Sequence, residues 1–172
     1  MNKQQALLII DLQNDYFPQG KYPLHNTDKV LSNIKIAIDE AKQKNIPTII
    51  IQHIAATDNA PFFNRGSVGV AIHPDILSLS ADADIVEKSA ADSFHQTNLD
   101  QVLATYQVTG LLIAGMMTQN CITHTAISKV AEKYNVTVIQ DCCTTVDEMI
   151  NKIALNALST RVKLRMVSEV FS

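Results

Sequence analysis

The sequence predicts an α/β fold of the doubly wound class: a parallel sheet of about six strands with helices on both faces. Short apolar runs rich in β-branched residues alternate with longer segments of helical periodicity. Most of the apolar runs are continuous rather than alternating, which is typical of strands buried on both faces. Strand–helix–strand alternation implies right-handed crossovers, so the expected architecture has three layers.

Six apolar runs are predicted to be the strands. Each is short, and turn-forming or helical residues flank it. The last run is interrupted by Arg165, so we expect it to be an edge strand of the sheet. The predicted strands cover residues 6–10, 48–52, 85–88, 110–114, 136–140 and 164–168.

The clearest helical pattern covers residues 30–44, where apolar residues recur at spacings of three and four. Thr27 or Asp28 is expected to cap this helix, and Asn45, which precedes Ile46 and Pro47, is expected to end it. The same periodicity predicts helices over residues 97–106, 120–134 and 146–161.

Length and composition indicate one globular domain over residues 1–172, since the chain has 172 residues and 47% of them are hydrophobic. A net charge of -3 with scattered lysines and arginines argues against a nucleic-acid surface. No run suits a signal peptide or a membrane span, so we expect a soluble, cytoplasmic protein with no membrane partner. The three cysteines form neither a disulfide framework nor a zinc-type spacing.

Ligands of such sheets bind outside the carboxyl ends of the strands. Asp11 follows the first predicted strand, after four branched apolar residues. Partial desolvation there would make its carboxylate a usable base, although a carboxylate that caps a turn is an equally good interpretation. Lys88 closes the third strand, where a lysine is more often a solvated surface residue.

Cys121 follows the fourth strand, where the next helix is expected to begin. The positive end of a helix dipole favours the thiolate, so we expect the pKa of this thiol to fall below the free value of about 8.5. The alternative is a buried cysteine that acts as a small hydrophobe. Packing is the preferred interpretation for the adjacent Cys142 and Cys143. A carboxylate, an ammonium group and a thiol on three neighbouring strand ends suit thiol-mediated acyl transfer.

Four segments together resemble the isochorismatase-like cysteine hydrolases. They are LLIIDLQNDY at residues 7–16, RGSVGVAIHP at 65–74, EKSAADSF at 87–94 and GMMTQNCITHTA at 115–126. They follow the order of the family's motifs over nearly the whole chain, with a serine in the second motif where the family has threonine. The resemblance implies an isochorismatase-like, Rossmann-like fold.

The resemblance also implies site residues. It implies a catalytic triad of Asp11, Lys88 and Cys121, in which Asp11 takes the thiol proton. It implies a cis peptide between Met116 and Met117, which aims the N–H of Met117, beside that of Cys121, at the substrate as an oxyanion hole.

Two further residues are expected in the substrate pocket. Tyr16 lies where the family places a pocket aromatic, and Gln52 is placed to hydrogen-bond a substrate. Packing is the alternative for Tyr16, and surface solvation is the alternative for Gln52.

The nicotinamidase branch of the family binds a metal through an Asp-x-His pair and a later histidine. The corresponding residues here are Ile51, Gln52 and His53, so the aspartate is missing. His53 and His73 alone make a poor zinc site. We therefore expect neither a metal nor another cofactor, and we interpret His53 as a pocket-lining or hydrogen-bonded residue.

These observations predict a hydrolase that cleaves the C–N bond of a small amide through a thioester on Cys121. The alternatives are vinyl ether hydrolysis of the isochorismatase type, a binding protein that has kept the fold, and a redox protein in which Cys142 resolves an oxidised Cys121. The expected partner is a small-molecule substrate. We also expect a homo-oligomer, dimer or larger, with residues 122–130 as a contact region.

Overall fold

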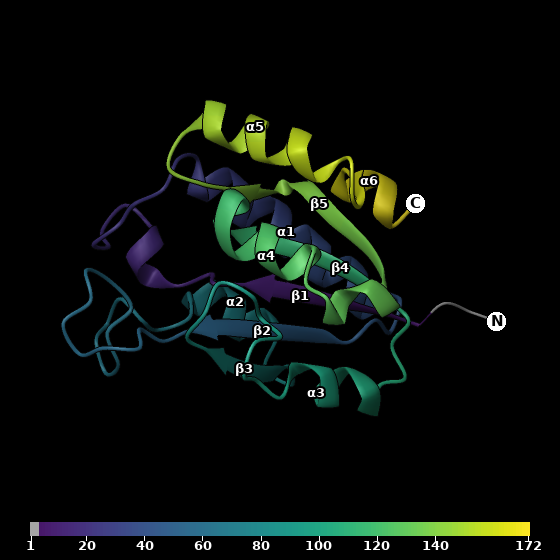
Figure 1. Ribbon diagram of the computed structural model, residues 1–172, viewed down its shortest axis with the longest axis horizontal. Helices are drawn as coiled ribbons and strands as arrows, with labels where there is room; N and C mark the ends of the chain where they lie inside the picture. Colours follow the sequence, from purple (N-terminus) through teal and green to yellow (C-terminus); the bar gives the residue numbers. More distant parts are fainter. Residues whose placement is uncertain (1–3) are drawn as a thin grey trace.

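The computed structural model describes residues 4–172, so the first three residues of the predicted domain lie outside it. Its core is a six-stranded parallel sheet in the order β3-β2-β1-β4-β5-β6 (Figure 1). The doubly wound fold predicted from the sequence is confirmed. The strands are β1 (Gln5–Ile10), β2 (Thr48–His53), β3 (Asp84–Lys88), β4 (Gly110–Met116), β5 (Asn135–Thr144) and β6 (Lys163–Arg165).

Helices cover both faces of this sheet, with α1 on the far side in Figure 1 and α4 on the near side. The alternating residues of β1 show the two layers, because Leu7 and Ile9 pack in one hydrophobic core whereas Leu8 and Ile10 pack in the other. The first core is covered by α1 (Thr27–Gln43), α2 (Pro74–Leu79) and α6 (Val167–Val170), and the second by α3 (Leu99–Thr105), α4 (Thr123–Ala126) and α5 (Glu148–Leu158). Within residues 4–172, no helix is long and apolar enough to cross a bilayer.

The helix predicted over residues 120–134 is wrong as a continuous element. The chain forms a π turn (Thr118–Ile122), then the four-residue α4, then a 3-10 turn (Val130–Lys133). Thr123 donates its hydroxyl to the Thr118 carbonyl, and such short-range bonds compete with the helical ladder. Cys121 therefore lies inside a π turn and not in the first turn of a long helix.

Two other elements differ from the prediction. Residues 167 and 168, predicted as strand, belong to α6, and β6 is only three residues long, although it is an edge strand as expected. The short α2 was not predicted. It begins at Pro74, and the Nδ1 of His73 caps it by accepting the Asp75 N–H.

Gly115 is required where β4 pairs with the last residue of β1. It pairs with Ile10, it has a φ of +131°, and a Cβ added there would lie 2.0 Å from the Ile10 carbonyl oxygen. Gly115→Ala should lower the free energy of unfolding by roughly 1–3 kcal/mol or more, because two backbones would have to separate. Urea unfolding measures the loss. Gly110→Ala on the same strand is the control, since its nearest atom would be an ordinary 3.4 Å away. Equal losses in both variants would contradict the prediction.

Candidate active site

Three side chains predicted from the sequence meet at the carboxyl edge of the sheet. Asp11 follows β1, Lys88 ends β3, and Cys121 lies in the π turn after β4. The Lys88 Nζ lies 2.9 Å from Asp11 Oδ2 and 3.2 Å from Cys121 Sγ. All three residues are buried, with exposed fractions of 0%, 3% and 1%. The arrangement is a thiol and a carboxylate joined by one ammonium group.

The Lys88 ammonium is held by its neighbours. Burial lowers the pKa of this lysine, but the charge of Asp11 and the hydrogen bonds to Asp11 and Cys121 oppose the burial, and the pKa is raised overall. The Ala90 carbonyl accepts a further hydrogen bond at 3.1 Å. Lys88 is therefore a buried cation that is paired and hydrogen-bonded, not the solvated surface lysine that strand ends usually carry.

Only one of the two Asp11 carboxylate oxygens accepts a hydrogen bond from the described residues. Oδ2 accepts from Lys88, whereas Oδ1 is buried and has no hydrogen-bond partner among residues 4–172. The backbone of Asp11 is left-handed, with a φ of +57°, and its N–H donates to the Ile51 carbonyl. An unpartnered buried acceptor is costly and uncommon, so Oδ1 is the atom in this cluster that is ready to accept a proton.

The thiol of Cys121 is protonated in the resting site, contrary to the prediction of a lowered pKa. Burial raises its pKa most, and the charge of Asp11 raises it further, while Lys88 opposes both. The predicted lowering relied on a helix dipole, but the adjoining α4 has only four residues. The site therefore holds a neutral thiol beside an ionic pair.

The chain between β4 and Cys121 turns sharply. The Met116–Met117 peptide bond is cis. The Met117 carbonyl accepts the N–H groups of Asn120 and Ile122, whereas the Met117 N–H has no acceptor within residues 4–172. The turn thus leaves a free backbone donor at the end of β4, close in the chain to the thiol.

Tyr16 and Gln52 occupy different positions around this centre. Tyr16 is buried, and its pKa is raised first by that burial and then by the charge of Asp11. Gln52 donates its amide to the Val70 carbonyl at 2.9 Å. Its role as a substrate contact stays a prediction, because in this structure the protein itself engages the amide.

A comparison with protein families matches residues 5–169 to the isochorismatase domain, which is nearly the whole chain. The chain belongs to the isochorismatase family. The resemblance seen in the sequence is thereby confirmed, and the family makes the protein a hydrolase.

Relatives and solved structures agree with this family. The isochorismatase family protein YddQ of Bacillus subtilis is 37% identical over 81% of this chain and 77% of its own length. A protein of Arabidopsis thaliana named a probable inactive nicotinamidase is 31% identical over 81% of this chain and 80% of its own. Ureidoacrylate amidohydrolase RutB of Serratia proteamaculans is 26% identical over 72% and 62%. A crystal structure from Oleispira antarctica, assigned to the isochorismatase hydrolases, superposes with a TM-score of 0.88, 31% identity and coverage of 99% and 97%.

His53, interpreted from the sequence as lining the pocket, is a member of the site. It ends β2 in register with Lys88, and its Nδ1 lies 2.9 Å from the Lys88 Nζ. Burial and then the charge of Lys88 lower the pKa of the imidazole, against a smaller effect of Asp11. The signal in the sequence was that His53 and Lys88 both end strands, but only the pairing of β2 with β3 shows that they are neighbours.

The residues present do not fit a metal ion. Ligand atoms of Asp11, His53 and Cys121 all lie within 4.8 Å of one another, which is compact enough for one cation. The Lys88 Nζ, however, lies 2.9 Å, 2.9 Å and 3.2 Å from these three groups and already supplies a positive charge there. A divalent ion would have to displace the ammonium and overcome its repulsion. In this isochorismatase-family chain, a lysine occupies the centre of the donor set.

The other predicted ligand, His73, serves the fold instead. Its ring lies 4.4 Å from the ring of Phe17, centroid to centroid, and its Nδ1 caps α2. His73 is not part of the compact donor cluster.

Cys142 and Cys143 lie on opposite sides of the sheet, as expected for neighbours on a strand. Both are buried and neither is in a disulfide. Cys142 packs in the core covered by α1, whereas Cys121 belongs to the core on the other face. The sheet therefore separates the two thiols, which argues against Cys142 as the resolving partner of an oxidised Cys121.

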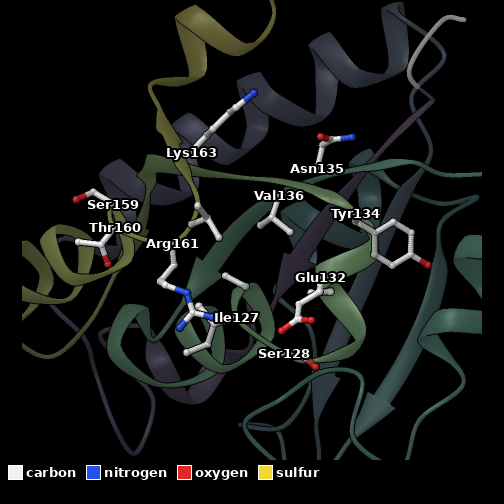
Figure 2. Close-up of a pocket in the computed structure, with 13 residues that line it drawn as sticks. Ile127, Ser128, Glu132, Tyr134, Asn135, Val136, Ser159, Thr160, Arg161 and Lys163 are labelled. Atoms are coloured by element: carbon white, nitrogen blue, oxygen red, sulfur yellow. The ribbon is translucent and has the colours of Figure 1, made fainter.

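A hollow of about 490 Å³ lies away from this centre (Figure 2). Figure 2 shows Tyr134, Asn135 and Val136 at the start of β5 on one side, and the segment that includes Ser159 and Arg161 on the other. Ser159 and Arg161 come just before β6 in the chain, and Tyr134, Asn135 and Val136 lie at or next to the first residue of β5. The hollow therefore lies toward the amino ends of these two strands. Ligand sites of parallel sheets lie at the carboxyl ends, where Asp11, Lys88 and Cys121 meet.

Proposed function

We propose that the protein hydrolyses the C–N bond of a small amide through a thioester on Cys121. One observation carries this proposal: the Lys88 ammonium contacts both Asp11 and Cys121, a carboxylate oxygen of Asp11 lies within 4.8 Å of the thiol sulfur, and Asp11 Oδ1 is buried and has no hydrogen-bond partner among residues 4–172. A nucleophile, a base and a group that orients the base are the parts that covalent catalysis needs.

In the acylation step, Cys121 Sγ bonds to the amide carbonyl carbon and the thiol proton moves to Asp11 Oδ1. Because the resting thiol is neutral, attack and proton transfer proceed together rather than from a preformed thiolate. The C–N bond then breaks, and the proton on Asp11 passes to the leaving nitrogen, which departs as ammonia or an amine. Lys88 holds the Asp11 carboxylate in an ion pair before the step and stabilises negative charge on sulfur during it.

The deacylation step uses the same carboxylate. Water attacks the thioester carbon and gives a proton to Asp11, the C–S bond breaks, and that proton returns to the sulfur. Both tetrahedral intermediates carry an oxyanion. The backbone N–H groups of Met117 and Cys121 are proposed as its donors, supported by the absence of an acceptor for the Met117 N–H within residues 4–172.

Two observations favour an amide over a vinyl ether. The thiol faces a base that is able both to remove its proton and to deliver that proton to a leaving nitrogen. In addition, an amidohydrolase, RutB, is among the relatives of this chain. Among the described residues, we find no feature of the site that favours cleavage of a vinyl ether over cleavage of an amide.

The proposal is tested with a panel of small primary carboxamides at neutral pH, followed by ammonia release and by intact-protein mass spectrometry after acid quench. We expect at least one amide to release ammonia and to leave an acyl adduct that maps to the peptide of Cys121. Cys121→Ala is the control, and it should show neither signal. Turnover that persists in this variant would overturn the thioester mechanism, and the absence of any turnover or adduct would overturn the proposed function.

The assembly of the protein remains a proposal. Of the segment 122–130 predicted as a contact region, Ile122 and Ala126 are buried in the chain's own core, whereas Ile127 and Val130 are each 37% exposed. The α5 helix is more open, with Met149 exposed at 70% and Ile153 at 63%. If a homo-oligomer forms, α5 therefore offers more apolar surface than the predicted segment does.

A further inference from the structure

His53 belongs to the site, yet no step of the proposed reaction uses it. Its Nδ1 lies 2.9 Å from the Lys88 Nζ. An ammonium group has hydrogens to donate but no lone pair, so Nδ1 must be the acceptor. The proton of the neutral imidazole is therefore on Nε2. A single contact with Lys88 thus fixes which nitrogen of the ring is a donor.

The position of the ring is fixed as well as its proton. Gln13 holds the backbone of His53 on both sides, because its Oε1 accepts the His53 N–H and its Nε2 donates to the His53 carbonyl, each at 2.8 Å. The Gln13 amide also donates to the Val70 carbonyl. The ring of Phe63 stands beside the imidazole at a centroid distance of 5.7 Å. A donor held in this way loses little conformational freedom when a ligand binds.

The donor itself is free. His53 Nε2 has no hydrogen-bond partner among residues 4–172, and it is not among the buried unpartnered atoms, so solvent reaches it. We propose that His53 binds the substrate, with its Nε2–H donating a hydrogen bond to an uncharged acceptor, such as a carbonyl oxygen, next to the scissile amide. This inference rests on the proposed function.

The surrounding charges indicate the class of acceptor. Lys88 is paired with Asp11, and Arg65, which lines the neighbouring hollow, is paired with Glu87 at 3.0 Å. Both cations are already paired with carboxylates of the protein, so neither is available to pair with a carboxylate on the substrate. A neutral imidazole donor suits a neutral oxygen, and since its ring lies in the same compact cluster as the thiol, the acceptor is close to the amide carbon. We therefore expect amides with a second carbonyl group to be preferred over plain alkyl amides.

The matched probes are acetoacetamide and butyramide, which are similar in length and differ in the ketone oxygen. The wild-type protein should have a kcat/KM for acetoacetamide that exceeds that for butyramide, and His53→Leu should lower this ratio about 3- to 10-fold, the effect of one hydrogen bond. The change should be in KM for acetoacetamide more than in kcat. His53→Gln keeps an N–H donor and should retain part of the preference. An unchanged ratio in His53→Leu would overturn the inference.

A second measurement does not depend on turnover. Nitrogen-15 NMR of histidine-labelled protein should show His53 as the Nε2–H form, and the same resonance should shift when acetoacetamide, but not butyramide, is added to Cys121→Ala. Lys88→Met should release the ring to a mixture of forms. If no amide is hydrolysed, the proposed function fails, while these spectra still decide the role of His53. A proton on Nδ1, or equal responses to the two amides, would overturn the inference.

Discussion

Asp11→Asn should lower kcat by about 10³-fold or more, because the substitution removes the only proposed base and keeps its shape. The amide oxygen that replaces the carboxylate can still accept from Lys88, but it is not a useful proton acceptor. Ammonia release from the best amide of the panel measures the loss. Asp100→Asn is the matched control, since Asp100 is a partly exposed carboxylate on α3, outside the site, that pairs with Lys133 at 2.7 Å. That variant should keep its activity.

Stability has to be separated from chemistry in this experiment. Asp11→Asn leaves the buried Lys88 without a counter-charge, and breaking a buried pair in this way costs about 3–5 kcal/mol. The double variant Asp11→Asn/Lys88→Met removes both charges, so it should regain much of the stability in urea unfolding but none of the activity. If the double variant hydrolysed the amide at an appreciable rate, Asp11 would not be the base.

Alkylation of Cys121 by iodoacetamide should respond to its two charged neighbours in opposite directions. Burial and Asp11 raise the pKa of this thiol, and Lys88 lowers it. Removing Asp11 should therefore lower the pKa and increase the thiolate fraction below that pKa, whereas removing Lys88 should decrease it. A charge at this range shifts a pKa by about 1–3 units, so Asp11→Asn should be labelled about tenfold faster or more at pH 8, and Lys88→Met slower by a similar factor. Peptide mass spectrometry over a pH series gives both rates.

The opposite signs make this test specific. The wild-type rate should still be rising at pH 9, since the thiol is neutral at rest. Labelling of the buried Cys142, followed in the same digests, reports general opening of the structure and should not change with the Asp11 substitution. If both variants were labelled more slowly than the wild type, Asp11 would be acting as a base that creates a resting thiolate, and the neutral-thiol mechanism would be wrong.

Much of the fold could be predicted because burial on both faces leaves a direct trace in the sequence. Continuous apolar runs such as Leu7–Ile10 gave the strands, and regular spacing gave α1 to within a few residues of its ends. The prediction was wrong for residues 120–134, which form the end of a π turn, the four-residue α4 and a 3-10 turn instead of one helix. It missed α2 because a proline and a histidine cap, rather than an apolar pattern, begin that helix.

By itself the sequence determined the doubly wound sheet and named Asp11, Lys88 and Cys121 as candidate catalytic residues. Residues that follow parallel strands share one edge of the sheet, whatever the details of packing. Only the tertiary structure decided that the pKa of Cys121 is raised and that Lys88 contacts the His53 imidazole. It also decided that Lys88 lies among Asp11, His53 and Cys121, the three side chains that could otherwise bind a metal. These properties depend on burial and on charges brought within a few ångströms by segments far apart in the chain, and electrostatic interactions vary steeply with both.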